Sequence, residues 1–499
     1  MLIGQQPFWG VGRLHLSNMG IREPRFGKCD DLRPFFVFLQ KRPDCLQNKK
    51  GFLRMFMLKD YKISAFVSFV KNDEGVISCY NWKNGESVDF FEKRHPAYKL
   101  FNQEPISDFV EKQEWIDDLT WLTETGFITP IRNEKETIVL AEQPEILHLI
   151  ILPAGEACNL RCVYCYEAHE DVQRMNVDHI ERIVKLCEQY KDKFVRIEYF
   201  GGEPLLNKNF ISKLASELNS RKIPFTASIT TNATLINENV LTLLYQSNVK
   251  VFQITIDGVE ETHNTLRPAF NHQENSFQAV CNALRVIQKS SYKDLKIFVR
   301  SNVNEKSISS QKLEAFFDTI KSIIPVNDKR FSFLFRPIGD YAAANERKAI
   351  NQESICNHAN SNEVTTTIEN FFESAGYLLA DTQMMISDGG YSCYANEKNS
   401  FVISPDFSIK KCTVALNDPL NNVGTLKENG KIAFNDNYSL WLKRYSDEEC
   451  YSCYMFRSCR GNGCTLANIK NNQKNCPPNK KQKDKYVPRI LKFIEKMEA

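Results

Sequence analysis

The chain has 499 residues, more than one hydrophobic core ordinarily organises, so two or three domains are expected. Lysine and arginine total 64 and aspartate and glutamate total 61, a near balance that gives no electrostatic argument for binding nucleic acid or an anionic membrane. No apolar run approaches the roughly 18 residues of a membrane-spanning helix, and the N-terminus lacks the pattern of a secretory signal. We therefore expect a cytoplasmic protein with no nucleic-acid or membrane partner.

The first part of the chain, residues 1–145, is expected to form a small α+β domain. Residues 65–70 are an apolar run between polar turns and predict a strand. Apolar residues at helical spacing over residues 106–123 predict a helix with Gly126 at its C-cap, and residues 128–140 are compatible with a hairpin. A winged-helix-like domain fits this mixture, and so does an extension that only packs against the following domain.

A regular alternation of strand and helix signals begins near residue 146. Six apolar runs indicate buried strands, at residues 147–152, 195–200, 225–230, 251–256, 296–301 and 331–335. Helical segments lie between them, near residues 177–191, 208–220, 236–247, 275–290 and 307–323. Parallel strands covered by helices are the expected arrangement. Six units are fewer than the eight that close a barrel, so we predict an α/β fold with an open, partial (β/α)6 TIM-like barrel over residues 146–340 and a site at the carboxyl ends of its strands.

Three cysteines follow the first of these strands directly. Cys158, Cys162 and Cys165 have the spacing C-x3-C-x2-C. Such a loop can place three thiolates around one face of a four-iron cluster and leave the fourth iron without a protein ligand. A zinc site, or three unpaired core cysteines, is the alternative. Zinc sites usually pair C-x2-C units, and a fourth ligand would have to come from elsewhere.

Glycines and polar residues follow the next three strands, at the same predicted edge of the sheet. Two adjacent glycines, Gly201 and Gly202, let a backbone approach a ligand closely, and Glu203 supplies an anion beside them. Hydrogen bonds that only order the loops, or a helix N-cap after the third strand, are the alternatives. The candidate ligand-contacting residues at these strand ends are Gly201, Gly202, Glu203, Thr231, Asn232, Thr255, Asp257 and Arg267.

The C-terminal part of the chain is rich in cysteine. We expect a linker with a helical segment over residues 341–392, a cysteine-rich domain with a hairpin over residues 393–480, and a final helix over residues 481–499. Residues 393–480 contain seven cysteines, which are enough for two metal sites. They are Cys393, Cys412, Cys450, Cys453, Cys459, Cys464 and Cys476. Cys356 is a further candidate ligand, although a free buried thiol is the preferred interpretation. Free thiols are also expected at Cys29, Cys45, Cys79, Cys187 and Cys281.

The cysteine loop resembles the signature of the radical S-adenosylmethionine (SAM) enzymes, C-x3-C-x-aromatic-C, with Tyr164 as the aromatic residue. The stretch 201–204 is similar to the GGEP motif of that family, and 231–234 to its T-N-G-T motif, with Ala233 in place of glycine. The stretch 255–267 is similar to S-x-D-G-x4-H-x3-R. In that family the open iron chelates the amino and carboxylate groups of SAM. One electron from the cluster cleaves SAM to methionine and a 5′-deoxyadenosyl radical, which removes a hydrogen atom from the substrate.

This resemblance implies roles for the residues at the strand ends. Glu203 and the adjacent backbone would hold the SAM amino group, and Arg267 would pair with the SAM carboxylate through two nitrogens. The side chains of Thr231 and Asn232 would meet the ribose region, and Asp257 would meet ribose or substrate. Tyr164 and Thr255 are assigned to the same cofactor site.

The C-terminal cysteines resemble the SPASM extension of radical SAM enzymes. The resemblance implies two auxiliary [4Fe–4S] clusters, one held by Cys450, Cys453, Cys459 and Cys476, the other by Cys393, Cys412 and Cys464. The sequence departs from the pattern of the extension in three ways. Eighteen residues separate the first two cysteines, Phe407 stands where the family often has glycine, and the last spacing of the run is x4 instead of x3.

Together these resemblances imply a maturase that crosslinks a ribosomally synthesised peptide through a thioether, carbon–carbon or carbon–oxygen bond. The N-terminal domain would hold the leader peptide as an added strand, and a flavodoxin or ferredoxin would donate electrons. Oxidation of a protein side chain, as in sulfatase maturation, is a second hypothesis. Family members with that activity carry an aspartate as a base where this chain has Thr413, which argues against it. A non-catalytic iron–sulfur or zinc protein is the third, and the strand-end motifs argue against it.

Overall fold

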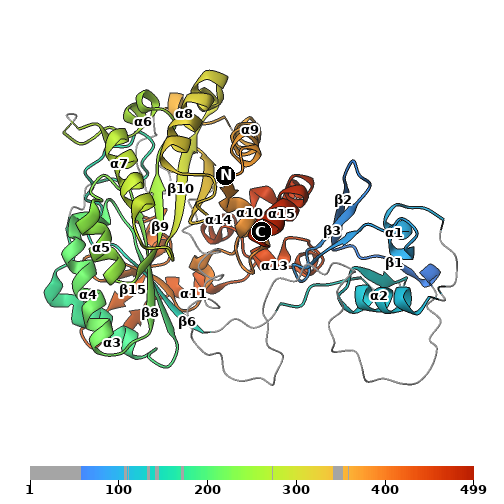
Figure 1. The fold of residues 1–499 in the computed structure, drawn as a ribbon. Helices are drawn as coiled ribbons and strands as arrows, with labels where there is room; N and C mark the ends of the chain where they lie inside the picture. The colour runs from blue at the N-terminus through green and yellow to red at the C-terminus, as the bar shows by residue number, and fades with distance from the viewer. Residues whose placement is uncertain are drawn as a thin grey trace.

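The computed structural model describes residues 58–105, 110, 112–131, 135–140, 145–169, 173–271, 274–340, 352–357 and 359–498. An 11-stranded sheet is the largest feature of these ranges, and two small sheets lie in the segment that precedes it. Figure 1 shows this N-terminal segment to one side of the main body, with helices α3, α4, α5 and α7 along one side of the large sheet. Within the same ranges no helix has the length and apolar character that crossing a membrane requires.

Six consecutive strands of the large sheet are parallel and follow one another in chain order. They are Ile146–Ile151 (β6), Phe194–Tyr199 (β7), Phe225–Thr231 (β8), Val249–Thr255 (β9), Lys296–Val303 (β10) and Phe331–Pro337 (β11). The helices that follow them are Ile180–Glu188 (α3), Lys208–Ser220 (α4), Glu238–Gln246 (α5), Glu260–Leu266 (α6), Ser276–Lys289 (α7) and Ser310–Ile323 (α8). The predicted α/β fold with a helix-covered parallel sheet is confirmed.

The large sheet continues beyond these six strands on both sides. Leu378–Leu379 (β12) adds a short parallel strand next to β11, and Ser400–Ile403 (β13) pairs in parallel with β6. Ser408–Lys410 (β14) then forms the expected hairpin with β13, and Asn422–Leu426 (β15) and Ile432–Phe434 (β16) follow in antiparallel order. The cysteine-rich segment is therefore built onto the barrel sheet and has no separate sheet of its own in the described ranges.

The turn of this hairpin explains one departure from the family pattern. Phe407 has φ +62°, in the left-handed region where a side chain is strained and glycine is favoured. Its ring packs under the guanidinium of Arg182, 4.7 Å away, and its side chain is 3% exposed. Burial of the ring against the barrel helix α3 offsets the backbone strain at this position.

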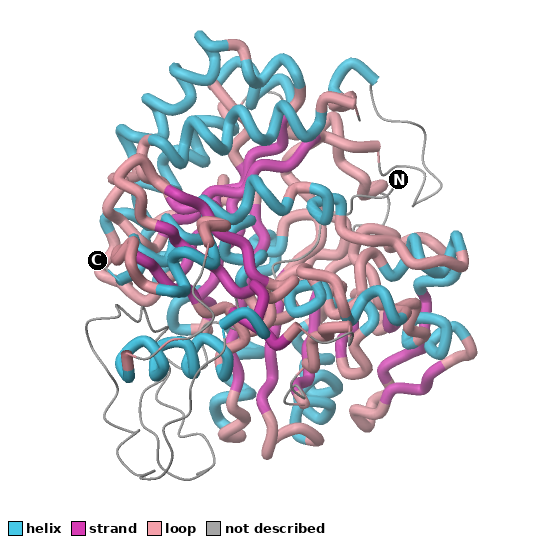
Figure 2. Tube along the Cα trace, turned by 90° about the vertical axis from the view of Figure 1, so that its right-hand side faces the viewer, coloured by secondary structure: helices cyan, strands magenta, loops and turns pink. Residues whose placement is uncertain are grey.

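The helices of the linker and of the C-terminus pack together. They are Ser361–Ser374 (α9), Ala380–Ile386 (α10) and Lys483–Glu498 (α15), which Figure 1 labels beside the large sheet. Figure 2 shows helices, in cyan, on several sides of the magenta strands. A buried carboxylate links two of them. Glu369 of α9 forms ion pairs with Lys485 at 2.8 Å and with Arg489 at 2.6 Å, both on α15.

The N-terminal segment differs from prediction in one respect. Its strands are Tyr61–Ile63 (β1), Val67–Lys71 (β2), Ile77–Asn81 (β3), Ser87–Phe90 (β4) and Ile128–Pro130 (β5), with helices Pro96–Phe101 (α1) and Gln113–Glu124 (α2). The hairpin expected over residues 128–140 is wrong, because β5 pairs with β1 and the described residues 135–140 contain no strand. Ile138 instead donates a backbone hydrogen bond of 2.7 Å to Tyr451 in the cysteine-rich segment. The first residues of the helix predicted over 106–123, at 106–109 and 111, lie outside the described ranges.

Replacing Glu369 with alanine should lower the free energy of unfolding by about 3 kcal/mol, because Lys485 and Arg489 lose the buried carboxylate with which both pair. The side chains of Glu369 and Arg489 are only 3% and 4% exposed. Thermal unfolding followed by circular dichroism measures the change. Glu217→Ala is a matched control, because its ion pair with Lys213 is partly exposed and its loss should leave the melting temperature close to that of the wild type. Equal melting temperatures for both variants would contradict the buried network.

Candidate functional site

The loop after β6 is fixed by a second segment of the chain. Arg161 and Val163 donate backbone hydrogen bonds of 2.8 and 2.9 Å to Pro268 and Leu266, which follow or end α6. The Arg161 side chain also donates to the carbonyl oxygens of Cys158 and Leu160, at 2.8 Å each. The loop therefore has a defined conformation before any ligand is considered.

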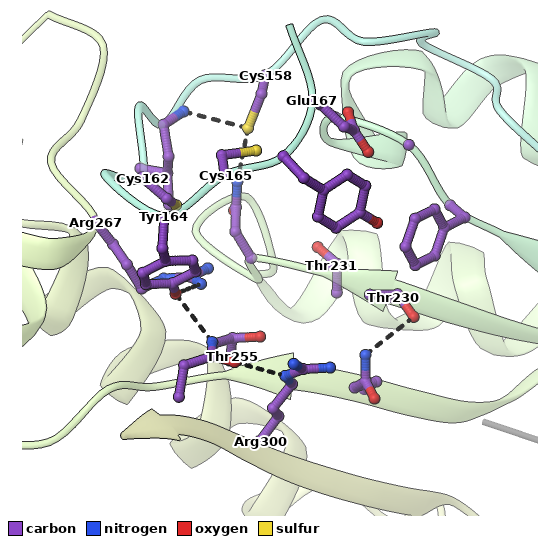
Figure 3. Close-up of a pocket in the computed structure, with 18 of the residues that line it drawn as sticks. Cys158, Cys162, Tyr164, Cys165, Glu167, Thr230, Thr231, Thr255, Arg267 and Arg300 are labelled. Carbon is purple, nitrogen blue, oxygen red and sulfur yellow. Dashed lines mark hydrogen bonds between the residues drawn. The ribbon is translucent and has the colours of Figure 1, made fainter. Parts of the chain in front are cut away.

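The three cysteines of this loop line a single cavity at the carboxyl ends of the parallel strands, with an empty volume of about 710 Å³. Figure 3 shows Cys158, Cys162 and Cys165 on one side of the cavity and Thr230, Thr255 and Arg300 across from them. Two predicted residues, Glu203 and Asp257, are missing from the lining. The predicted residues that do line the cavity are Cys158, Cys162, Tyr164, Cys165, Gly201, Gly202, Thr231, Asn232, Thr255 and Arg267.

Glu203 lies behind the cavity wall and connects two loops. It is fully buried, and its carboxylate accepts hydrogen bonds from the backbone nitrogens of Leu205 and Asn232 at 3.0 and 2.8 Å and from the Thr231 hydroxyl at 2.7 Å. The Asn232 amide in turn lies 3.8 Å from the Cys158 sulfur. From the sequence, Glu203 was predicted to contact SAM. The geometry instead supports a role in which Glu203 holds Asn232 in position beside Cys158.

The two glycines of the same loop allow close packing of backbone on backbone. A Cβ atom at Gly201 would lie 2.5 Å from the Gly155 carbonyl oxygen, and one at Gly202 would lie 2.3 Å from that of Ala157. Gly201 also has φ +107°. The sequence suggested that these glycines approach a ligand. They line the cavity, and they also bring the loop after β7 against the residues that precede Cys158.

Asp257 belongs to a buried polar cluster at the ends of β9 and β10. Its carboxylate accepts a short hydrogen bond from the Tyr164 hydroxyl and one of 2.7 Å from the backbone nitrogen of Asn302. Arg267 donates to the same Tyr164 hydroxyl at 2.8 Å and lies 3.9 Å from the Asp257 carboxylate. Asp257 was predicted to contact ribose or substrate. Its position instead fixes Tyr164 and Arg267, which do line the cavity.

The sequence analysis missed several polar residues of the cavity wall. Thr230, Gln253, Arg300 and Asn302 lie on β8, β9 and β10, and all four line the cavity. Arg300 donates through Nε to the Asn302 side chain at 2.9 Å. Their signal was present in the sequence, because polar residues interrupt otherwise apolar, buried strands shortly before their carboxyl ends.

The protein around the three thiols disfavours negative charge. Burial raises the pKa of Cys158 to about 12, and Glu203 adds to that shift. Burial likewise raises the pKa of Cys162 and, more strongly, that of Cys165. The free thiols are therefore neutral at ordinary pH. A bound metal centre supplies positive charge and reverses this preference, because coordinating thiols lose their protons.

The residues of the cavity fit an iron–sulfur cluster and a polar cofactor. Three thiols on one loop provide the donor set for three irons. In the described part of the chain, Nε of Arg267 and Oε1 of Gln253 are buried without a hydrogen-bond partner. Both residues line the cavity, so these atoms remain available to polar groups of a ligand.

Four of the C-terminal cysteines line a second cavity: Cys476 and three others. We call Cys393, Cys412 and Cys464 the three-thiol set, and the cavity has an empty volume of about 1350 Å³. Burial raises the pKa of Cys412 and Cys464, the latter to about 11, and the proximity of Cys393 adds to both shifts. Phe335 and Pro337, at the carboxyl end of β11, line the same cavity.

The other four C-terminal cysteines gather in a neighbouring cavity. We call Cys450, Cys453, Cys459 and Cys476 the four-thiol set. Cys476 also lines the cavity of the three-thiol set, so the two sets share a wall. The predicted division of the cysteines into two ligand sets stays a prediction, because Cys476 lines both cavities. No three histidine, cysteine, aspartate or glutamate residues within the described ranges are arranged to hold a single metal ion.

Thr413 stands where enzymes of the sulfatase-maturing type carry an aspartate, and its side chain is a buried hydroxyl. Thr413 is fully buried, and its Oγ1 lies 3.0 Å from the Tyr394 hydroxyl. Its backbone nitrogen donates to the same hydroxyl at 2.8 Å. Burial raises the pKa of Tyr394 well above its ordinary value, so this pair contains no proton acceptor comparable to a carboxylate.

The remaining cysteines lie apart from these sets. Cys79, Cys187, Cys281 and Cys356 are buried free thiols that line none of the three cysteine cavities. For Cys356, the free thiol is thus the interpretation the structure favours over an extra ligand. Cys29 and Cys45 lie outside the described ranges.

Comparison with known proteins gives a family model and several relatives. The model described as the Radical SAM superfamily matches residues 152–303. The radical SAM cyclopropyl synthase TigE of Paramaledivibacter caminithermalis is 23% identical over 269 residues, covering 44% of this chain and 56% of TigE. An uncharacterized protein of Methanocaldococcus jannaschii is 32% identical over 133 residues, covering 26% and 46%. The chain thus spans about half the length of these two relatives.

Two further comparisons cover more of the chain. The cysteine-type anaerobic sulfatase-maturating enzyme of Clostridium novyi is 26% identical over 346 residues, covering 64% of this chain and 87% of that enzyme. A solved structure described as native anSMEcpe with bound AdoMet and Cp18Cys peptide has a TM-score of 0.54 at 20% identity, covering 71% of this chain and 100% of that chain. At this identity the structural likeness shows a shared fold.

The buried Glu198 of β7 should make stability depend on pH. Burial raises its pKa from 4.5 to about 8, although Arg196 opposes the shift. Between pH 4.5 and 8, Glu198 is ionised in the unfolded chain but still protonated in the folded protein. The free energy of unfolding is therefore highest at low pH and falls as the pH rises towards 8. The loss is at most about 1.4 kcal/mol for each pH unit. Glu198→Gln should therefore match the wild-type melting temperature near pH 5 and exceed it near pH 8. The exposed Glu238→Gln is the control, and a pH-independent difference for Glu198→Gln would contradict the assignment.

Proposed function

The chain carries a radical SAM domain over residues 152–303, and on this premise we propose that it is a radical SAM/SPASM maturase that forms a crosslink in a ribosomally synthesised peptide. The observation that carries the proposal is the cavity in which three loop thiols meet the polar ends of neighbouring parallel strands. When bound there, a [4Fe–4S] cluster and SAM supply reductive cleavage of SAM and removal of a hydrogen atom from the substrate.

The residues of the chain have separate tasks in this proposal. Cys158, Cys162 and Cys165 would hold the cluster. Arg267 and Gln253, each with a buried polar atom free of hydrogen bonds in the described ranges, would bind polar groups of SAM or of the substrate. These contacts fix the orientation of the reacting groups, which is the main contribution of a protein to chemistry that a cofactor carries.

Buried carboxylates would keep this wall of the cavity in place. Glu203 fixes Asn232, which in turn contacts the Cys158 sulfur, and Asp257 fixes Tyr164 and Arg267. Each carboxylate is satisfied by protein donors, so neither needs the cofactor in order to be held in a buried position. The cavity is therefore largely formed before its ligands bind.

The two C-terminal thiol sets would hold two auxiliary [4Fe–4S] clusters. The three-thiol set would leave one iron without a cysteine, and the four-thiol set would complete its cluster. Their separate cavities, with Cys476 in the shared wall, support this division.

One position in the chain favours crosslinking over the oxidation of a protein side chain as the reaction. An aspartate base after the second SPASM cysteine accompanies the sulfatase-type oxidation, and here Thr413 and Tyr394 occupy that place with a hydroxyl pair. Neither hydroxyl accepts a proton readily at neutral pH. The relatives include a cyclopropyl synthase as well as a sulfatase-maturating enzyme, so similarity alone does not select between the two reactions.

The peptide partner would bind in two places. Its reacting residue would enter the cavity at the strand ends, and its leader would add a strand to the N-terminal sheet of β2, β3 and β4. In that sheet β2 and β4 are the edge strands, and an edge strand can accept a peptide by backbone pairing. A flavodoxin or ferredoxin would serve as the electron-transfer partner.

Replacing Cys162 with alanine should reduce formation of 5′-deoxyadenosine from SAM by at least about 100-fold under reduction with dithionite, because the cluster loses one of three ligands. Liquid chromatography of anaerobic reactions measures the product. Cys281→Ala, which removes a buried thiol outside the cysteine cavities, is the matched control and should retain the activity. A wild-type rate in Cys162→Ala would remove the radical SAM assignment.

Replacing Cys464 with alanine should separate SAM cleavage from product formation. The three-thiol set would lose a ligand while the cavity of Cys158 remains intact, so 5′-deoxyadenosine should still form and the modified peptide should fall below detection. Mass spectrometry of the peptide gives the second readout. Cys356→Ala is the control, since this thiol lies outside both sets. Unchanged peptide product in Cys464→Ala would show that the three-thiol set has no part in the reaction.

A further inference from the structure

The N-terminal segment packs against the part of the chain that carries three members of the four-thiol set. Figure 1 shows β2 and β3 beside Phe456–Cys459 (α13) and α15. Tyr80 and Trp82 of the N-terminal segment belong to one hydrophobic cluster with Met455 and Phe456. Met455 and Phe456 also line the cavity of the four-thiol set, so the N-terminal segment lies directly behind one wall of that cavity.

Two hydrogen bonds tie the same run of cysteines to the N-terminal segment. The backbone nitrogen of Ile138 donates to the carbonyl oxygen of Tyr451 at 2.7 Å, and Tyr451 follows Cys450 directly. Arg457, on α13, forms a side-chain hydrogen bond with Tyr80. The backbone and the side chains next to these thiols are thus held by residues from a distant part of the sequence.

Tyr454 connects three parts of the chain around the four-thiol set. It follows Cys453 directly. Its ring lies 4.8 Å from the ring of Trp82 at an interplanar angle of 70°, an edge-to-face contact that stabilises both rings. Its hydroxyl donates to the carbonyl oxygen of Lys480 at 2.7 Å, four residues after Cys476. Tyr454 therefore links the N-terminal segment to both of the chain segments that supply thiols.

The position of Trp82 is fixed within its own small sheet. Its indole Nε1–H donates to the hydroxyl of Ser68 on β2 at 3.0 Å, and its ring lies 5.1 Å from the ring of Tyr80 at 89°. The side chain is 3% exposed. Because the sheet meets both the polar and the apolar requirements of this side chain, Trp82 offers Tyr454 a fixed surface to pack against.

We propose that the N-terminal segment is a structural part of the four-thiol site, with Trp82 as its positioning residue. Trp82 holds Tyr454, and through it the thiols of Cys453 and Cys476, in the arrangement that takes up a [4Fe–4S] cluster. The aromatic contact also excludes water from this side of the site, and an apolar surrounding controls how strongly a metal centre is retained. The inference rests on the proposed function, which supplies the cluster.

This role is additional to the binding of a leader peptide and does not depend on it. The contacts of Trp82 with Ser68, Tyr80 and Tyr454 are formed within the protein alone. An N-terminal segment that served only to hold a peptide would have no need to pack on the residues that line a cysteine cavity. The retention of iron by the four-thiol set therefore tests the proposal without any peptide.

The experiment follows the loss of iron from the full-length, anaerobically reconstituted protein after addition of EDTA. Trp82→Ala is the test variant, and Trp82→Phe keeps an aromatic ring against Tyr454. Trp121→Ala is the matched control, because Trp121 belongs to the same N-terminal segment but stacks on Phe127 in its separate core. Tyr454→Leu is a second test variant that leaves the N-terminal segment unaltered and removes the contact from the other side. Electron paramagnetic resonance of the reduced protein shows which variants lack a cluster signal.

The wild type should hold about 12 irons per chain. In Trp82→Ala and in Tyr454→Leu, about four of these irons should leave at least about tenfold faster than in the wild type, with loss of one cluster signal. Trp82→Phe and Trp121→Ala should release iron at nearly the wild-type rate. Formation of 5′-deoxyadenosine with dithionite should persist in every variant, because the cavity of Cys158 is not altered.

Equal rates of iron loss in the wild type, Trp82→Ala and Tyr454→Leu would overturn the inference and leave the proposed function standing. Equally fast loss in Trp82→Ala and Trp121→Ala would also overturn it, since any damage to the N-terminal segment would then have the same effect. A wild-type protein that binds no cluster at the four-thiol set would overturn both the inference and the assignment of that auxiliary cluster.

Discussion

Parallel pairing of β6 is the constraint on which the rest of the structure depends. Because β6 to β11 all run in one direction, their carboxyl ends meet at one edge of the sheet, and the cysteine loop after β6 faces the ends of β8, β9 and β10. The same strand also pairs with β13, which anchors the cysteine-rich segment to the barrel. The cavity of the three-thiol set therefore has walls from both sides of the six-stranded unit, with Cys393 and Cys412 around β13 and β14 and Phe335 and Pro337 on β11.

Buried polar groups turn this edge into a site with fixed geometry. Carboxylates are costly to bury unless donors satisfy them, and the donors here come from the same loops that carry the candidate ligand-binding residues. Glu203 orders the loop of Asn232, and Asp257 orders Tyr164 and Arg267. The thiols, whose pKa values burial raises, are neutral in the protein alone and gain their charge only when a metal centre compensates it. The protein thus orders the walls of the site by itself, whereas the charge of the thiols depends on the bound metal centre.

Much of this could be predicted from sequence because it rests on local signals. The six parallel strands and most of their helices follow from apolar runs and helical periodicity, and the loop thiols from their spacing. Long-range pairing could not be read in the same way: β13 adds to the barrel sheet, and β5 pairs with β1 instead of forming a hairpin with later residues. The orientation of Glu203 and Asp257 away from the cavity also depends on which donors the fold brings near them. Arg300 and Asn302 were detectable as polar interruptions of a buried strand, and the prediction did not use that signal.

The most direct test of the account is a joint measurement of iron, sulfide and 5′-deoxyadenosine on anaerobically reconstituted protein with dithionite and SAM. Three four-iron clusters predict about 12 irons per chain, with 5′-deoxyadenosine formed from SAM. About four irons with 5′-deoxyadenosine would mean that the C-terminal thiol sets hold no clusters, and the crosslinking account would be contradicted. Fully loaded protein that forms no 5′-deoxyadenosine, even with candidate precursor peptides present, would contradict the radical SAM activity itself.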